Sequence, residues 1–414
     1  MNRIALALTT ALVSCLAPLA HADDWPEFRG PTGQGLLLKG TLPLTWSKDN
    51  NVIWKQEVPG KGWSSPVVVD GRVYLTTAVE RDNGDQSLRA LCLDALKGKI
   101  LWQKEIVRQN GKQAPRIHGK NSHASPTPLV RDGKLFVHFG HQGTACLDLD
   151  GKILWRNTML RYAPVHGNGG SPVLVDDMLV FSCDGGDKRF VVALNVRDGK
   201  VRWTTPRVVQ APKKFSFSTP LLIDVSGQKQ IISSGSNVVC AYDPANGKEI
   251  WRVRYNGYSV IPRPVYGHGL LFIGTGYDRP SLLAIRPDGK GDVTSTHVVW
   301  KMTKAAPHTP SPLLVGDELY TISDGGVASC LDARTGEAYW QERLGGSYSA
   351  SPLFADGKLY FQSEQGTGVV LQAGKEYKLL AKNPLDERSL ASAAAADGDL
   401  FLRTQSHLYR IGSR

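Results

Sequence analysis

The chain has 414 residues, a formal net charge of +11 and 41% hydrophobic residues. Its lysines and arginines are spread along the chain without an arginine-rich block, which argues against nucleic-acid binding. A basic surface of this kind is either simply solvated or attracts anionic polysaccharides or membrane surfaces. After the N-terminus, no stretch of the sequence approaches the roughly 18 apolar residues that a membrane-spanning helix needs.

Residues 1–22 have the order of a secretory signal peptide. Arg3 gives a short positive region, an apolar stretch runs from Ile4 to Leu19, and residues 20–22 form a small-x-small cleavage site before Asp23. The alternative is a lipobox at residues 12–15, which would make Cys15 a lipidated, membrane-held N-terminus. The sequence therefore predicts a periplasmic or secreted protein, with an outer-membrane lipoprotein as the alternative.

A phrase made of a small residue, proline, an apolar run, a tight turn and a second apolar run recurs along the chain. Clear copies are SSPVVVDGRVYL, PTPLVRDGKLFV and SPLFADGKLYF. Each predicts a β-hairpin, because Asp-Gly turns match the twist of two antiparallel strands. Apart from an insertion of roughly Glu105 to Asn121, the copies follow the roughly 40–50-residue blade period of propellers. The phrase is marked by Pro66, Pro128, Pro172, Pro220, Pro264, Pro312, Pro352 and, in the eighth copy, Ala393.

A second phrase, apolar-Asp-x-x-x-Gly-Lys-x-x-Trp, alternates with the first, as in LCLDALKGKILW and AYDPANGKEIW. It predicts a third strand, a glycine turn and a fourth strand whose tryptophan fills the wedge between neighbouring sheets. Repeat seven lacks the tryptophan, so Tyr377 or Leu379 is the expected substitute and weaker packing is expected there. The tryptophans of this phrase are Trp102, Trp155, Trp203, Trp251, Trp300 and Trp340.

Repeat eight ends near Ile411 without a fourth strand, while a spare strand, Asn51–Val58 with Trp54, precedes repeat one. Pairing the two would close the ring and remove an exposed sheet edge. The predicted fold is therefore all-β: an eight-bladed β-propeller over residues 51–414, with four antiparallel strands per blade, after an N-terminal extension over 23–50. We expect it to be a monomer.

Three repeats carry a cysteine, Cys92, Cys146 and Cys330, where other repeats carry alanine. A position shared by cysteine and alanine is typical of a small buried site. Equivalent positions in a ring of blades should lie beyond the ~7 Å Cα separation that a disulfide allows. The sequence predicts free, buried thiols.

These phrases resemble the tryptophan-docking repeats of quinoprotein propellers. The run Trp25–Pro31 (WPEFRGP), followed by LPLTW and NVIWK, is similar to the start of secreted bacterial PQQ-binding-like β-propeller repeat proteins. The resemblance covers nearly all of the chain after residue 22 and implies a propeller of PQQ-like repeats. It is a poor guide to function, because propellers host many chemistries.

The candidate site follows from the topology of a propeller, since the segments that enter the innermost strands meet around one mouth of the channel. Charged and aromatic side chains converging there would suit an anionic or sugar ligand, although channel residues also serve merely to satisfy strand ends and water. The candidate ligand-binding residues are Lys61, Trp63, Lys120, Asn121, His123, His166, Asn168, Lys214, Tyr258, Arg263, His308, Tyr348 and Arg388. The candidates for an acid or base are His123, His166, His308, Tyr258 and Tyr348.

No metal site is predicted. His118 with His123, and His138 with His141, lack a nearby carboxylate pattern, and Pro287–Asp292 is a loose calcium-loop match better explained as a solvated turn.

Four functions remain open. The first is an exported binding or scaffold module for a protein partner or a glycan. The second, implied by the resemblance, is a PQQ- and calcium-dependent dehydrogenase of alcohols or sugars. Such enzymes commonly use adjacent cysteines and acidic residues, and neither is found in the segments above, so no cofactor is assigned. The third is a non-redox carbohydrate enzyme such as a lyase. The fourth is an outer-membrane assembly factor like BamB, which has repeats of the same class.

Overall fold

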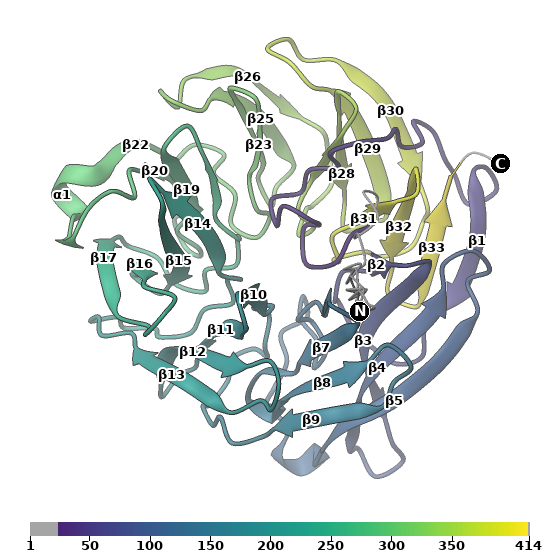
Figure 1. Ribbon diagram of the computed structural model, residues 1–414. Coiled ribbons are helices and arrows are strands. Elements are labelled where there is room, and N and C mark those ends of the chain that lie inside the picture. Colours follow the sequence, from purple (N-terminus) through teal and green to yellow (C-terminus); the bar gives the residue numbers. More distant parts are fainter. Residues whose placement is uncertain (1–23, 413–414) are drawn as a thin grey trace, which may run out of the picture.

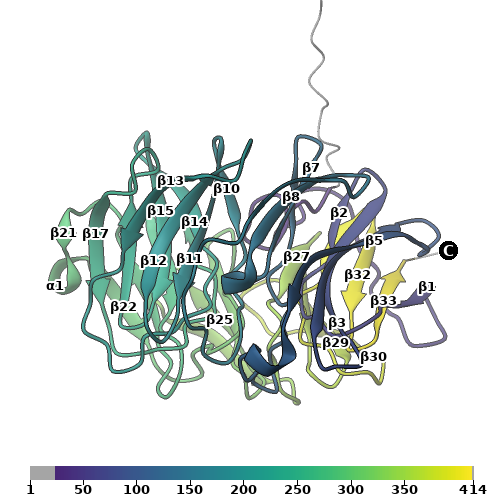
Figure 2. The same cartoon turned by 90° about the horizontal axis from the view of Figure 1, so that it is seen from below.

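The computed structural model describes residues 24–412. Eight sheets stand around a central axis, so the predicted all-β, eight-bladed propeller is confirmed (Figures 1 and 2). The helical elements described are a single short α-helix, α1 (Thr294–His297), and two 3-10 turns, η1 (Gly111–Gln113) and η2 (Gly140–Gln142). Within the described residues no helix is long and apolar enough to cross a membrane.

Each blade is a four-stranded antiparallel sheet whose strands run from the channel outwards. Blade one has β2 (Val67–Val69), β3 (Arg72–Glu80), β4 (Gln86–Asp94) and β5 (Ile100–Gln109); blade two has β6 (Leu129–Arg131), β7 (Lys134–His138), β8 (Thr144–Asp148) and β9 (Ile153–Asn157). Blade three has β10 (Val173–Val175), β11 (Met178–Asp184), β12 (Arg189–Asn195) and β13 (Val201–Pro206); blade four has β14 (Leu221–Val225), β15 (Gln228–Gly235), β16 (Val238–Tyr242) and β17 (Glu249–Arg254).

The second half of the ring repeats this order. Blade five has β18 (Val265–Gly267), β19 (Leu270–Gly274), β20 (Leu282–Ile285) and β22 (Val298–Met302); blade six has β23 (Leu313–Val315), β24 (Glu318–Ile322), β25 (Val327–Asp332) and β26 (Ala338–Arg343). Blade seven has β27 (Leu353–Ala355), β28 (Lys358–Gln362), β29 (Thr367–Gln372) and β30 (Leu379–Pro384); blade eight has β31 (Ala394–Ala396), β32 (Asp399–Arg403), β33 (His407–Ile411) and β1 (Val52–Glu57).

The Asp-Gly dipeptides form the inner hairpins, as predicted. Asp70 and Gly71 have φ angles of 49° and 68°, the positive pair of a tight turn whose twist matches that of the flanking strands. Two successive positive φ angles also occur at Asp132 and Gly133 and at Asp356 and Gly357.

Every repeat tryptophan except Trp251 donates a hydrogen bond to the next blade. Trp102 Nε1 donates to the carbonyl of Leu149, 3.0 Å away, and its ring covers Gly151, where a Cβ would lie only 3.0 Å from the indole. The wedge function predicted for these tryptophans is therefore confirmed. The same bond joins Trp54 to Ala95, Trp155 to Val196, Trp203 to Pro244, Trp300 to Ala333 and Trp340 to Gly374.

Trp251 departs from this pattern and donates to Gln230 Oε1 instead, at 2.8 Å. The reason is the turn after β20, where β21 (Gly291–Asp292) pairs in parallel with β17 of the preceding blade. The segment Pro287–Asp292 is largely exposed, as expected of a solvated turn, and through β21 it also bridges two blades. Asp292 binds Arg254 and Thr294 in the folded protein.

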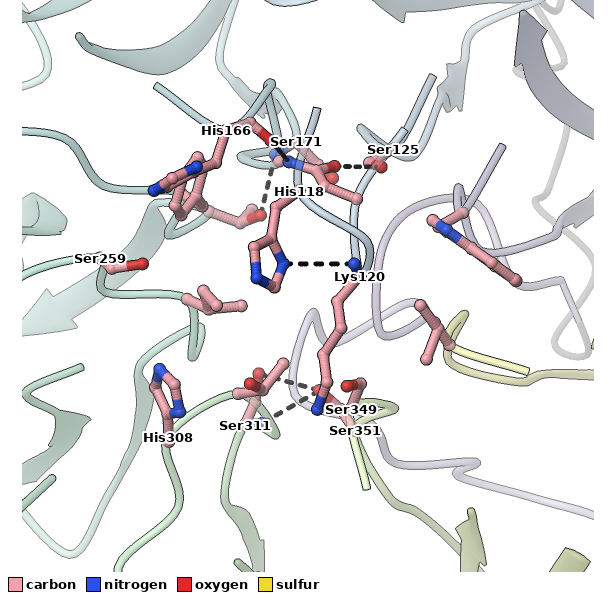
Figure 3. A pocket seen from close by; sticks show the side chains of 18 of the residues that line it. His118, Lys120, Ser125, His166, Ser171, Ser259, His308, Ser311, Ser349 and Ser351 are labelled. Carbon is pink, nitrogen blue, oxygen red and sulfur yellow. Dashed lines mark hydrogen bonds between the residues drawn. The ribbon is translucent and has the colours of Figure 1, made fainter. Parts of the chain in front are cut away.

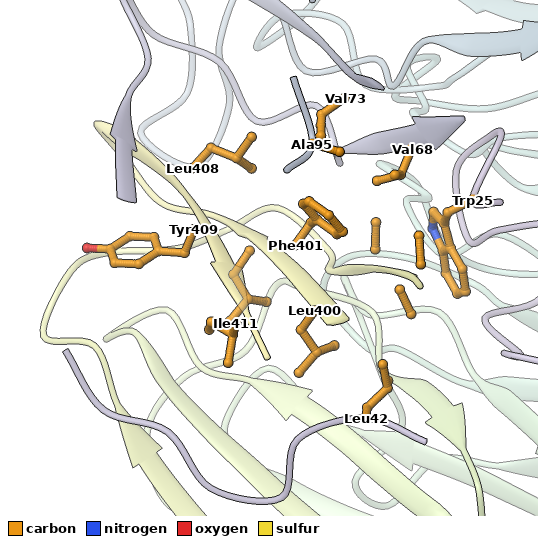
Figure 4. Close-up of a cluster of buried hydrophobic side chains, with 14 of the residues drawn as sticks. Trp25, Leu42, Val68, Val73, Ala95, Leu400, Phe401, Leu408, Tyr409 and Ile411 are labelled. Atoms are coloured by element: carbon orange, nitrogen blue, oxygen red, sulfur yellow. The ribbon is translucent and has the colours of Figure 1, made fainter. Parts of the chain in front are cut away.

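The N-terminal strand closes the ring as predicted. β1 pairs antiparallel with β33, with Lys55 opposite Tyr409 and Glu57 opposite His407. Behind it, a cluster that includes Phe401, Leu400 and Ile411 joins blade eight to blade one and to Trp25 of the extension (Figure 4).

Blade seven differs from the prediction. Ala381, opposite Val370, occupies the register position that tryptophan holds in blade six, and Leu379 is 42% exposed. The missing ring comes from the extension: Trp46, 4% exposed, stacks on Tyr360 with ring centroids 6.5 Å apart. Its backbone N–H donates to Asn383 Oδ1 at 3.1 Å. Tyr377 instead packs edge-on against Trp340 of blade six, so neither predicted substitute fills the slot.

The rest of the extension crosses the channel as a plug, here defined as residues 25–37 and visible as the purple trace near the centre of Figure 1. Trp25 pairs with Val68 of blade one, and Leu37 with Phe354 of blade seven. Between them, Glu27 forms an ion pair with Arg263 of blade five at 3.0 Å. The channel is therefore spanned by a segment held from several blades.

All cysteines of the described part of the chain are free and buried, as predicted: Cys92, Cys146, Cys183, Cys240 and Cys330.

Candidate functional site

A ring of hydroxyl groups encircles the channel just before the innermost strands begin. The backbone N–H of Ser65 donates to Thr127 Oγ1 at 3.0 Å, and that of Thr127 donates to Ser171 Oγ at 2.9 Å. The same link continues from blade to blade as far as Ser392 of blade eight, except between blades four and five, where Arg263 replaces the hydroxyl. The ring consists of Ser65, Thr127, Ser171, Thr219, Ser311, Ser351 and Ser392.

Above this ring lies the main pocket, which encloses about 750 Å³. Phe28 of the plug lines it, so the plug contributes to its floor. The side chains of Figure 3 come from several blades and face one opening, with His118 and Lys120 projecting into its middle. The convergence of distant strand-entry segments on one volume, expected from the sequence, is observed.

One side of the pocket is an arc of aromatic rings. His118 packs on His166 with centroids 5.6 Å apart, and His166 packs on Phe215 at 5.3 Å. The arc continues from Phe215 to Tyr258 at 5.8 Å, to Tyr277 at 5.7 Å and to His308 at 4.7 Å. Such an arc offers several ring faces and edges to a ligand.

His308 ends the arc beside a fixed carboxylate. Its Nδ1 lies 3.5 Å from Oδ1 of Asp324, which is held by the N–H groups of His308 and Thr309 and by the Thr309 hydroxyl. Burial lowers the pKa of His308 below its usual 6.5, opposed by Asp324 and reinforced by Lys120. The imidazole is therefore neutral at pH 7, and its buried Nε2 has no hydrogen-bond partner among the described residues.

The insertion after blade one builds the opposite side. Its first residues extend β5 as far as Gln109, so only residues 110–122 form the loop that was expected to begin near Glu105. Lys120 from this loop binds Glu364 Oε1 at 2.6 Å, and Glu364 also accepts from Ser349. Asn121 donates to the carbonyl of His166 at 2.9 Å, which ties the loop to blade three.

The predicted residues fall into three groups. Trp63, Lys120, Asn121, His166, Tyr258 and His308 line the main pocket. A smaller second pocket beside it is lined by Lys61, His123 and Arg388, and shares Trp63 and Asn121 with the first.

The remaining predicted residues lie outside both pockets. Asn168 is buried and accepts from Tyr162 at 2.9 Å, and Lys214 is exposed next to Lys213, which lines the main pocket in its place. Arg263 turns down to the plug, where it binds Glu27 and the carbonyl of Phe28. Tyr348 is 1% exposed, packs in the core of blades six and seven, and burial raises its pKa to about 12.

Three of the side chains that the sequence analysis missed share one origin. Tyr277, Asp324 and Glu364 each come from the turn after the second strand of a blade. These turns reach the same mouth as the strand entries, so a search of both loop sets would have found them. The segments that enter the innermost strands contain no carboxylate, but these turns bring two to the mouth: Asp324 lines the pocket and Glu364 anchors Lys120.

A family model described as outer membrane protein assembly factor BamB matches residues 39–122, 92–287 and 289–407. The chain belongs to this family of propeller repeats. BamB of Shewanella oneidensis is 23% identical over 237 residues, which cover 52% of this chain and 56% of that protein. The dehydrogenase subunit of a quinone alcohol dehydrogenase of Gluconobacter oxydans is 24% identical over 274 residues, 61% of this chain and 31% of that protein. The matches thus span about half or less of these relatives.

Solved structures agree on the fold. BamB of Moraxella catarrhalis has a TM-score of 0.61 at 12% identity, covering 88% of this chain and 97% of its own. Quinohemoprotein alcohol dehydrogenase of Comamonas testosteroni has a TM-score of 0.55 at 13% identity, covering 95% and 81%. These likenesses show the propeller alone.

The residues at the mouth do not fit a calcium–quinone centre. Asp324 is occupied by three donors and Glu364 by Lys120 and Ser349. No group of three His, Cys, Asp or Glu in residues 24–412 is placed to hold a metal ion, and the sequence has no adjacent cysteine pair.

Proposed function

We propose that the chain is a saccharide-binding propeller whose ligand sits in the main pocket. The observation that carries the proposal is the combination of the aromatic arc with the hydroxyl ring in one cavity. A sugar presents apolar C–H faces, which stack on aromatic rings, and hydroxyl groups, which need donors and acceptors. The pocket supplies both.

The polar groups of the pocket support this assignment. The hydroxyls of the ring can exchange hydrogen bonds with the hydroxyls of a sugar, while Lys213, bonded to the Tyr258 hydroxyl at 2.6 Å, donates. Phe28 lies in the floor of the pocket, so we expect a ligand to enter only through the mouth.

The test is a glycan array followed by calorimetry on the saccharides retained. Tyr258→Ala removes a central ring of the arc and should weaken binding about tenfold, the order expected for one aromatic contact. Tyr339→Ala, an exposed tyrosine on the outer strand β26, is the matched control and should bind like the parent chain. An array that retains no saccharide, or a Tyr258→Ala variant with full affinity, would refute the proposal.

A protein partner is the second candidate, favoured by the family match to an outer-membrane assembly factor. It would contact the rim or the outer strands, where Leu101 and Leu154 are 48% and 46% exposed. Cross-linking in cells that traps a partner through these strands, together with a silent glycan array, would favour it over the saccharide.

We also propose that the chain is exported and cleaved before Asp23. The signal-like order of residues 1–22, which lie outside the described part, supports this. Mass spectrometry of the processed protein should give an unmodified N-terminus at Asp23. A diacylglycerol-modified Cys15 would instead establish a lipoprotein.

A further inference from the structure

The second pocket, of about 350 Å³, lies directly beside the main one. Trp63 and Asn121 line both cavities, so a ligand that leaves one over these residues enters the other. Two adjoining cavities of this kind suit a chain of linked units better than a single compact molecule.

The insertion loop forms the ridge between them. His118 and Lys120 line the main pocket, whereas Ile117, Gly119 and His123 line the second. The chain turns here, with the Asn121 N–H donating to the His118 carbonyl at 2.8 Å, so the loop presents residues to both cavities. Arg388 fixes the ridge by donating to the carbonyl of Gly119 at 2.9 Å.

The second pocket is cationic. Lys61 and Arg388 line it with only one carboxylate, Glu80. Burial lowers the pKa of His123, opposed by Glu80, so this imidazole adds a polar group without a charge at pH 7. Arg388 lies over the Trp63 ring, 5.8 Å from its centroid, and Lys61 has no ion-pair partner among the described residues. An anionic group placed here would meet two cations.

We propose that the second pocket recognises the acidic group of an oligosaccharide whose neighbouring unit occupies the main pocket. This rests on the proposed saccharide function and adds the substrate class: a carboxylated or sulfated glycan of at least two units. Trp63 stacks on the junction, and Lys61 with Arg388 holds the anion.

The experiment compares tetragalacturonate with its methyl ester, which keeps the sugar and removes the charge. Calorimetry of the parent chain should give about fivefold tighter binding for the acid, the order expected for a partly exposed charge pair. In Lys61→Met, which leaves Arg388 as the remaining cation, this preference should fall to about twofold. The Lys61 backbone, paired with Ala78, holds the position without the side chain.

Lys104→Met, an exposed lysine on the outer strand β5, is the control and should keep the preference for the acid. A sulfated carrageenan tetrasaccharide is measured in parallel to identify the acidic group. If Lys61→Met weakens its binding more than it weakens the binding of tetragalacturonate, the acidic group is a sulfate. Equal binding of acid and ester, or a preference that Lys61→Met leaves at its full size, overturns the acidic subsite while neutral saccharide binding still supports the proposed function. If no saccharide binds at all, both proposals fail.

Discussion

Replacing Trp46 by alanine should lower the free energy of unfolding by about 3–5 kcal/mol, the usual cost of deleting a buried tryptophan. Trp46 is 4% exposed and fills the wedge that the missing tryptophan of blade seven leaves. Its Nε1 has no hydrogen-bond partner among the described residues, so its contribution comes from apolar burial and stacking on Tyr360. Urea denaturation of the purified chain measures the effect.

Two further variants test whether the loss of stability comes from removing the buried ring of Trp46. Leu44→Ala removes a side chain that is 39% exposed two positions earlier, and should change stability by no more than about 0.5 kcal/mol. Trp46→Phe retains a ring over Tyr360 and should recover part of the loss. If Trp46→Ala is as mild as Leu44→Ala, blades seven and eight are held together without this ring.

The part of the fold that is repeated could be predicted from the sequence. The blades, the tryptophan docking and the closure by β1 follow from periodic phrases in which each copy supports the reading of the others. Trp46 has no such support, because it belongs to no repeat and meets Asn383, 337 positions away, only in the folded ring. A missing tryptophan in repeat seven indicated a gap, but nothing local showed that the extension would fill it.

The site was predictable to the extent that topology alone places residues. Knowing that strand entries share one mouth located Trp63, Lys120 and His308 in the pocket. The direction of each side chain was not predictable, because it depends on neighbours. Arg263 faces the plug because it binds Glu27 and the Phe28 carbonyl there. The ring of Tyr348 is buried in the core of blades six and seven.

The N-terminal extension therefore has two structural roles: Trp46 fills the gap in blade seven, and the plug crosses the channel. The ion pair between Glu27 and Arg263 holds the plug to blade five. Arg263 is buried in the channel, and the pKa of Arg29 nearby is lowered to about 9, first by burial and then by Arg263. Within residues 24–412, Glu27 is the one carboxylate within ion-pair distance of either arginine. The negative charge of Glu27 offsets the buried positive charge of Arg263, which would otherwise destabilise the folded protein.

Glu27→Ala should thus destabilise the chain by about 3 kcal/mol, because it leaves a buried guanidinium without its counter-charge. Glu27→Leu combined with Arg263→Met removes both charges and should regain most of this stability, measured by urea denaturation. Hydrogen exchange should show faster opening of the plug in Glu27→Ala alone, and saccharide binding should weaken with it, since Phe28 lines the floor of the pocket. Equal losses in the single and double variants would mean that packing of the plug, and not its charge balance, seals the channel.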